Sequence, residues 1–154
     1  MNKESEKMKL LNLLLENGSA MKKAKEIFLD EIVKNYHLTT IELTVLLFLK
    51  TSEFDTAKDI TNELFIAKSH VSLSVNLLNK KGYIQKIQDK ENRKITHLKL
   101  TEKSDEICRI ANLKINELED KLFNELTNED KKYMEKIFNI FYKNVKGVIE
   151  GENI

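Results

Sequence analysis

Residues that interrupt helices are almost missing from this chain. Its 154 residues contain no proline and only four glycines. Proline lacks a backbone N–H and clashes with the preceding helical turn, and a glycine inside a helix costs about 1 kcal/mol, so both residues usually mark helix ends. The sequence therefore predicts a fold that is mainly α.

The composition also indicates where such a protein works. Charged residues make up 33% and hydrophobic residues 41% of the chain, as in folded globular proteins. The leucine-rich segment 10–15 contains Asn12 and is followed by Glu16, so it is too short and too polar for a signal peptide or a membrane span. The single cysteine, Cys108, cannot form an internal disulfide and fits a reducing compartment. We expect a cytoplasmic protein without membrane contact.

Capping sequences mark the starts of two helices in the middle of the chain. In LTTIELTVLLFLK, Thr39 is followed three residues later by Glu42, and Thr56 is followed in the same way by Asp59. In a capping box each of these side chains accepts a hydrogen bond from a backbone N–H that the helix start leaves unpaired. We expect a heavily buried helix after Thr39 and a short one after Thr56.

Further helices flank this middle region. Residues 19–36 have apolar side chains at helical spacing, with Ser19 as a candidate N-cap, and the last helix is expected to begin at Thr127 with Asp130. The two C-terminal helices carry an apolar seam (Cys108, Ala111, Ile115, Leu118, Leu122) and a wide apolar stripe (Met134, Ile137, Phe138, Phe141, Val145, Val148). Because so small a domain cannot cover all these faces, we expect a dimer interface built from the two chain ends.

One segment of 25 residues, from Leu64 to Gln88, contains no Asp or Glu, although the whole chain has 25 acids. It includes a predicted fourth helix, whose Val71, Val75 and Leu78 recur at i, i+4 and i+7 and are expected to face the core. The outward positions are then Lys68, Ser69, His70, Ser72, Leu73, Asn76 and Lys80.

A β-hairpin is expected directly after this helix. Gly82 is placed to end the helix in a left-handed conformation that glycine adopts cheaply. Then YIQKIQ and ITHLKLT alternate as strands do, and the polar segment DKENRK between them is expected to form the turn. His97 lies on a face of the second strand, and we interpret it as a structural residue.

Positive charge is concentrated in the same part of the chain. Residues 56–103 carry ten Lys or Arg against five Asp or Glu, whereas the remaining residues carry 16 against 20. Such asymmetry often marks a contact with nucleic acid or another anionic surface. The alternative is that these lysines only solvate the surface.

Two short helices followed by a hairpin with a basic turn form the order of a winged helix-turn-helix. In that motif the second helix enters the DNA major groove, where a carboxylate would face phosphates at about one charge per 1.7 Å of duplex. Ser, His, Asn and Lys side chains can instead reach phosphates and base edges. A DNA-binding role therefore gives a physical reason for the missing acids.

Residues 38–103 resemble the MarR (multiple antibiotic resistance regulator) family of bacterial transcription factors. The matching segments are LTTIELTVLLFL, VSLSVNLLNKKGYI and NRKITHLKLTEKS, in this order. The resemblance implies a homodimer on a pseudo-palindromic operator in double-stranded DNA, with recognition helices in major grooves and wings in neighbouring minor grooves. The DNA contacts that we expect are Lys68, Ser69, His70, Ser72, Leu73 and Asn76 of the helix and Lys90, Arg93 and Lys94 of the turn.

The chain departs from the family pattern at two places. The family wing usually has Asp-x-Arg, in which the Asp braces the Arg, whereas this chain has Asn92 and Lys94 with Arg93 between them. Either basic residue can therefore take the role at the tip of the wing. Leu73 stands where the family often has a polar residue; it either contacts a thymine methyl group or packs on the hairpin.

The resemblance also suggests an effector, a small and often aromatic anion held between the dimer helices and the winged domain. Tyr36 and His37, at the junction of the first two helices, are our candidate residues for it. Cys108 is interpreted as a buried packing residue, with an oxidation sensor as the alternative. We expect neither a cofactor nor a metal site, because no two of the three His and one Cys are spaced three or four residues apart.

The expected organisation is an N-terminal dimerisation helix in residues 1–38, a winged helix-turn-helix in 39–102 and C-terminal dimerisation helices in 103–154. The function that we predict is a ligand-responsive repressor. An alternative is a protein-interaction regulator whose winged helix does not read a specific operator. An enzyme is not expected, because the sequence has no Gly-rich phosphate loop, nucleophile elbow or metal-spaced His pair.

Overall fold

A computed structural model describes the backbone of residues 3–151 and the side chains of residues 9–151. The outer ends of the two predicted dimerisation regions, residues 1–2 and 152–154, lie outside the described residues. The chain divides into two compact units, Met1–Asn116 and Glu117–Ile154.

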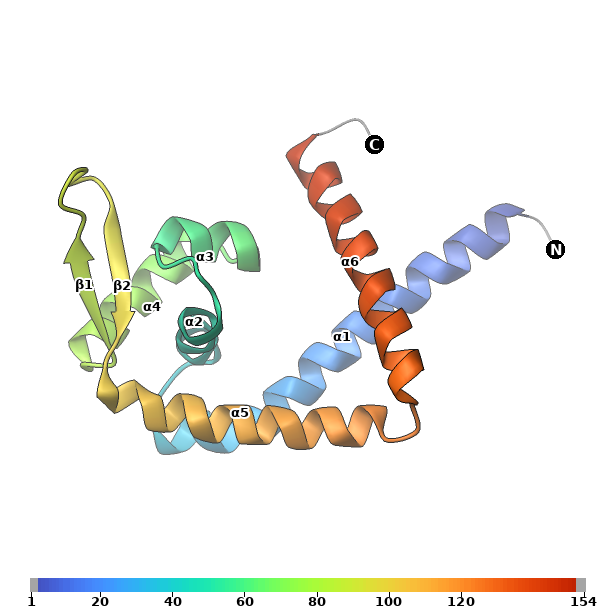
Figure 1. The fold of residues 1–154 in the computed structure, drawn as a ribbon, viewed down its shortest axis with the longest axis horizontal. Coiled ribbons are helices and arrows are strands. Elements are labelled where there is room, and N and C mark those ends of the chain that lie inside the picture. Colours follow the sequence, from blue (N-terminus) through green and yellow to red (C-terminus); the bar gives the residue numbers. More distant parts are fainter. Residues whose placement is uncertain (1–2, 152–154) are drawn as a thin grey trace. The chain divides into compact units, whose positions relative to one another are not determined.

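The described residues form six helices and one two-stranded sheet (Figure 1). The elements in chain order are α1 (Lys3–Asn35), α2 (Thr40–Thr51), α3 (Ala57–Leu64), α4 (Lys68–Lys80), β1 (Ile84–Gln88), β2 (Thr96–Leu100), α5 (Glu102–Phe123) and α6 (Asn128–Glu150). The predicted fold class, mainly α with a small β-hairpin and a winged helix-turn-helix, is confirmed.

Three helices begin as their capping sequences predict. Thr39, Thr56 and Thr127 are the N-caps of α2, α3 and α6, and each forms a complete capping box with the acid three residues later. In α3, for example, the Thr56 hydroxyl oxygen accepts a hydrogen bond from the Asp59 N–H, and the Asp59 carboxylate accepts one from the Thr56 N–H. These starts are set by local chemistry, so they could be identified from short segments of sequence.

The predicted start of the first helix is wrong. Ser19 lies inside α1, which already begins at Lys3 and continues through Gly18. One glycine costs a helix only about 1 kcal/mol, and the leucines, lysines and glutamates that precede it are good helix formers. The glycine therefore interrupts the apolar pattern without ending the helix.

The core of the first unit lies where α2, α3 and α4 meet. Val71, Val75 and Leu78 of α4 are buried, as their spacing predicts, together with Leu46 of α2 and Ile60 of α3. Between α3 and α4, Phe65 adopts a left-handed conformation with φ 52°, and this reverses the chain in the short turn of the helix-turn-helix. The buried side chains thereby fix which face of α4 points outward.

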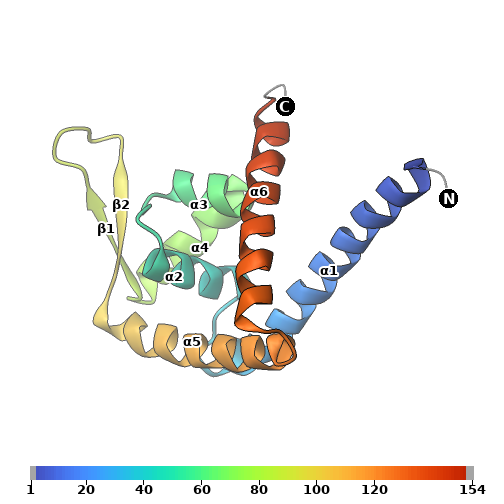
Figure 2. The ribbon, with the colours of Figure 1, turned by 45° about the vertical axis from the view of Figure 1, so that its right-hand side comes forward.

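The strands β1 and β2 form the predicted antiparallel hairpin, with Ile84 opposite Leu100 and Gln88 opposite Thr96. Gly82 connects α4 to the hairpin with φ +76°, which confirms its predicted left-handed role. The hairpin is attached to the start of α3 through a bridge between Thr56 and His97 and a 2.8 Å hydrogen bond from the Leu98 N–H to the Asp55 carbonyl. Both ribbon views show its tip extending beyond α3 and α4 (Figures 1 and 2).

A buried ion pair joins the α1–α2 junction to the end of α4. The Glu42 side chain has no exposed surface, and one of its oxygens accepts a 2.7 Å hydrogen bond from Lys81 Nζ. The same Nζ donates to the His37 carbonyl at 2.8 Å. Because a buried carboxylate needs a partner, Lys81 ties the chain after α1 to the C-terminus of α4.

Cys108 of α5 is fully buried, and its Sγ lies 3.8 Å from the Leu46 carbonyl. Burial raises the pKa of the thiol, so little of the reactive thiolate forms near neutral pH. These observations favour the packing interpretation of Cys108 over the oxidation sensor.

Helix α6 presents a broad apolar surface. Ile137, Phe138, Phe141 and Val148 of the predicted stripe are exposed, and Val148 keeps 70% of its surface accessible. By composition and length, none of the described helices alone is able to cross a membrane; only the segments Lys9–Asn35 and Thr40–Thr51 taken together, bent by 99° at their junction, meet those two criteria.

Candidate nucleic-acid interface

The outward face of α4 carries the side chains that the sequence predicts there. Lys68, Ser69, His70, Ser72, Leu73 and Asn76 are all exposed. The buried residues on the opposite side are set by helical spacing, so the exposed ones form a single surface that we call the α4 face. It contains hydroxyl, imidazole, amide and ammonium groups, and no carboxylate lies on it.

Asn76 on the α4 face is held by a residue that the sequence analysis missed. Lys86 Nζ of β1 donates a hydrogen bond to Asn76 Oδ1. With its oxygen occupied, the amide presents its two N–H donors, which suit the acceptor atoms of purine bases and phosphates. The alternation in YIQKIQ could have indicated this contact. It places Lys86 on the same strand face as Ile84, which is buried in the core, and β1 contacts α4.

Leu73 keeps 59% of its surface accessible. Packing on the hairpin, one of the two interpretations of this residue, would cover most of that side chain. A large apolar group left exposed among polar neighbours is available to a partner instead. The other interpretation of Leu73 is an apolar contact with a thymine methyl group.

The turn between β1 and β2 is held by side chains that bond its backbone. Asp89 Oδ1 accepts hydrogen bonds from the Glu91 and Asn92 N–H groups at 2.9 and 2.7 Å, and Asn92 Oδ1 accepts one from the Lys94 N–H at 3.1 Å. These bonds leave Lys90, Arg93 and Lys94 exposed. Asn92 thus braces the backbone of the turn, whereas the Asp of the family pattern would brace a basic side chain.

His97 joins this turn to the body of the winged helix. Its Nδ1 lies 2.7 Å from Asp55 Oδ1, and its Nε2 lies 3.2 Å from Asp89 Oδ2. Hydrogen bonds to Asp55 and then Asp89 raise the pKa of the imidazole. The Asn92 N–H, then His97 and the Glu91 N–H, hold the pKa of Asp89 below its ordinary value.

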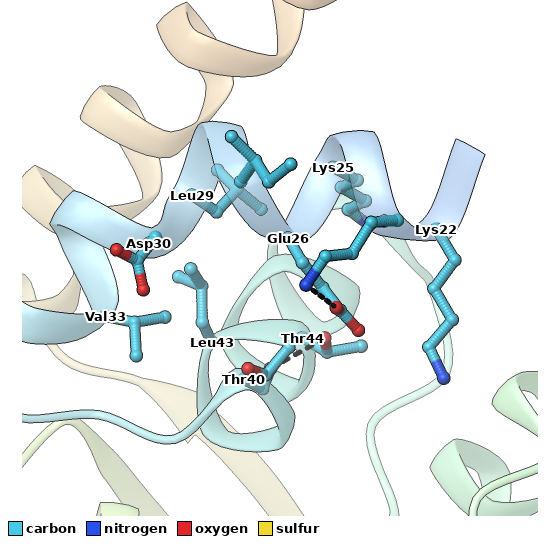
Figure 3. Close-up of a pocket in the computed structure, with 11 residues that line it drawn as sticks. Lys22, Lys25, Glu26, Leu29, Asp30, Val33, Thr40, Leu43 and Thr44 are labelled. Carbon is cyan, nitrogen blue, oxygen red and sulfur yellow. Dashed lines mark hydrogen bonds and ion pairs between the residues drawn. The ribbon is translucent and has the colours of Figure 1, made fainter. Parts of the chain in front are cut away.

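A cavity of about 510 Å³ lies between α1 and α2 (Figure 3). Its apolar part includes Leu29, Val33 and Leu43, and Lys22 and Lys25 of α1 border it. A third lysine, Lys23, forms a long ion pair of 3.9 Å with Glu26. The lining thus has three ammonium groups against two carboxylates, those of Glu26 and Asp30. This small excess of positive charge beside an apolar surface suits a small apolar anion.

Tyr36 and His37, the predicted effector residues, do not line this cavity. Tyr36 is half-buried, and its pKa is raised, first by burial and then by the nearby Glu106 carboxylate of α5. His37 is exposed in a left-handed conformation, with its carbonyl bound by Lys81. The sequence analysis missed the cavity, although the lysines of MKKAKE were a signal for its charged side.

No three His, Cys, Asp or Glu side chains within residues 9–151 are arranged to hold a metal ion.

A family model for a winged helix DNA-binding domain matches residues 38–104. The HTH-type transcriptional regulator BilQ of Clostridioides difficile (strain CD3) is 24% identical over 135 residues, covering 86% of this chain and 88% of that protein.

Solved structures of MarR proteins are also similar to this chain. A MarR protein from Peptoclostridium difficile DA00132 aligns with a TM-score of 0.76 and 26% identity over 88% of both chains. A putative MarR family regulator from Listeria monocytogenes complexed with 26mer DNA aligns with a TM-score of 0.77 and 18% identity, over 92% of this chain and 96% of the other.

The helix-turn-helix, the hairpin and the matching family model define a winged helix DNA-binding protein. The similarity to transcriptional regulators is not limited to this domain, because it covers 86% and 88% of the chain in the two comparisons. In sequence and structure the chain is similar to transcriptional regulators of the MarR family, as the sequence resemblance predicts.

Proposed function

We propose that the protein is a ligand-responsive repressor that binds a pseudo-palindromic operator as a homodimer. The observation that carries this proposal is the α4 face, an exposed helix surface without carboxylates beside a hairpin with a basic turn. A surface of this kind can approach DNA phosphates without charge repulsion. The Listeria relative that was crystallised with DNA supports the same use of the fold.

The α4 face enters the major groove in this proposal. Lys68 and Ser69, at the first turn, reach phosphates, while His70, Ser72 and Asn76 reach base edges. Leu73 contacts a thymine methyl group. Asn76 is the best placed of these for sequence reading, because Lys86 directs its amide N–H groups outward.

The turn of the hairpin reaches the neighbouring minor groove or its phosphates. Arg93 is our first choice for the contact at the tip, because the backbone around it is held by Gln88, Asp89 and Asn92 while its side chain is free to extend. Lys90 and Lys94 add phosphate contacts on either side. A planar guanidinium also suits a narrow groove better than an ammonium group does.

Dimerisation is assigned to residues 1–38 and 103–154, and DNA binding to residues 39–102. Exposed apolar side chains in α1 and α6, including Leu11, Leu15, Ile137 and Val148, support this division. Surfaces with so many large apolar groups normally lie in an interface. A cytoplasmic location is part of the same proposal, because a repressor must reach the chromosome.

The effector is a small aromatic or otherwise apolar anion. The cavity between α1 and α2 offers a place for it, because Lys22 and Lys25 line its charged side and Leu29 and Leu43 its apolar side. Tyr36 and His37 follow at the end of α1. A shift of this junction can reach α4 through the hydrogen bond between Lys81 and the His37 carbonyl.

The second candidate function is a protein-interaction regulator that does not read a specific operator. The exposed Leu73 and the replacement of the family's wing Asp by Asn92 are the observations that favour it. Both features weaken the usual DNA contacts of the family without affecting the fold.

Titration of the purified protein against its own promoter and against a scrambled duplex of the same length separates the two candidates. At low salt both duplexes should bind, with the promoter bound at least about tenfold more tightly, and both affinities should fall steeply with salt because phosphate contacts release counterions. Equal affinity for the two duplexes, or no binding at low salt, would contradict the repressor. Adding an aromatic carboxylate such as salicylate then tests release.

A further inference from the structure

The link from Asp55 through His97 to Asp89 connects three parts of the winged helix. Asp55 lies in the loop between α2 and α3, His97 in β2, and Asp89 directly after β1. The three side chains are only partly exposed, at 47%, 36% and 31%. The link therefore runs from the body of the domain, through the hairpin, to the first residue of its turn.

Both ring nitrogens of His97 face carboxylate oxygens, and this arrangement selects the charged imidazole. A neutral imidazole has one N–H donor and one acceptor, so it can donate to Asp55 or to Asp89 but not to both. The imidazolium donates from both nitrogens. Asp55 and Asp89 are also the charged groups that act on the ring, one from the α2–α3 loop and one from the end of β1.

Asp89 transmits this contact to the tip of the wing. Its Oδ2 faces His97, while its Oδ1 accepts the Glu91 and Asn92 N–H groups that shape the turn. A rotation of the carboxylate after the loss of one bond would also disturb the other two. Arg93 and Lys94 come directly after Asn92 in the chain, so their backbone would be displaced as well.

We propose that His97, in its doubly protonated form, is a positioning residue for DNA binding that fixes the wing against the body of the domain. This inference depends on the proposed contact between the wing and DNA. Loss of the proton breaks one of the two carboxylate bonds and frees the turn, so the affinity for the operator falls as the pH rises. His97 does not itself need to touch DNA.

The direction in which DNA affinity changes with pH follows from the charge state of His97. The folded protein favours the protonated imidazole, so the link is complete below its ordinary pKa of 6.5 and is lost as the pH rises through the raised value. DNA phosphates close to the wing stabilise the same charged form. The affected range therefore lies above pH 6.5.

The test compares His97→Gln with His70→Gln. Glutamine can keep one hydrogen bond but has no titrating charge, and His70 supplies the same substitution on the α4 face. Promoter affinity would be measured by fluorescence anisotropy from about pH 6 to about pH 8.5, a range in which histidine is the side chain that normally titrates. The wild type should weaken at least about threefold, His97→Gln should remove most of this dependence, and His70→Gln should keep more of it than His97→Gln.

A second measurement examines the protein without DNA. In NMR spectra of the free protein, the backbone amides of residues 91–94 should shift with the same midpoint as the His97 ring, above pH 6.5, and Asp55→Asn should lower that midpoint. Tip amides that do not follow the ring, or a His97→Gln variant with the wild-type pH profile of binding, would overturn the inference. Coupled titration in a protein that binds no DNA at any pH would contradict the proposed function, and with it any role of His97 in binding.

Discussion

The winged helix buries large apolar side chains in its core, whereas helix α6 leaves similar side chains exposed. Leu46, Ile60 and Leu78 of the winged helix have no exposed surface, whereas Ile137 and Val148 of α6 keep 63% and 70% of theirs. Helices α2 and α3 of the winged helix and helix α6 begin with the same kind of capping box, Thr-x-x-Asp or Thr-x-x-Glu. The local helix signals are therefore equally good, and the difference lies in what covers each apolar face.

This difference separates two kinds of stability. The winged helix buries its own core and holds its polar junctions internally, for example through Glu42 and Lys81. An exposed stripe on α6 gains little from folding of the single chain and much from contact with another surface. Substitutions in the first region should change folding, and substitutions in the second should change assembly.

The largest effect is expected from Leu46→Ala. Removing a fully buried leucine side chain should lower the free energy of unfolding by about 2–5 kcal/mol, because transfer energy is lost and a cavity remains. The matched control is Leu73→Ala on the exposed α4 face, which should change it by less than about 0.5 kcal/mol. Urea denaturation at one protein concentration measures both. Equal losses would mean that the winged helix does not depend on its own core.

A smaller effect on folding and a clear one on assembly are expected from Ile137→Asp. A carboxylate in an apolar interface should raise the dimer dissociation constant at least about tenfold, which corresponds to about 1.4 kcal/mol. Asn139→Asp introduces the same charge on α6 without removing an apolar group, and it should change the constant much less. Sedimentation equilibrium measures both, and an unchanged constant for Ile137→Asp would show that the dimer uses another surface.

The smallest effect is expected from Arg93→Ala. Promoter affinity should fall a few-fold, and the slope of log affinity against log salt should become shallower by about 0.9, because one phosphate contact is lost. The oligomeric state should stay the same. Arg109→Ala, which removes the other arginine of the chain, is the control and should leave both quantities unchanged. A normal salt slope for Arg93→Ala would assign the tip contact to Lys94.

The features that could be predicted from the sequence depend on neighbours along the chain. The capping boxes, the inward positions of α4 and the left-handed Gly82 all follow from residues within one or two helical turns. The predicted start of the first helix at Ser19 was wrong, because the residues on both sides of Gly18 are good helix formers and one glycine does not end the helix.

The contacts that could not be predicted join residues that are distant in sequence. Asp55 and His97 are 42 positions apart, and Lys81 and Glu42 are 39 apart. Which carboxylate meets which cation depends on how the hairpin and α4 pack on α2 and α3, and no local pattern contains that information. The cavity between α1 and α2 was missed for the same reason.

One isosteric change tests whether the α4 face binds DNA because it carries no acid. Asn76→Asp replaces the amide NH2 group with a carboxylate oxygen and keeps the size of the side chain. It should lower promoter affinity at least about tenfold in an anisotropy titration, because it loses a donor and adds a charge that phosphates repel. Asn124→Asp, in the α5–α6 loop, is the matched control and should bind as the wild type does. If Asn76→Asp, folded and dimeric like the wild type, binds its promoter with unchanged affinity, the α4 face is not the surface that meets DNA.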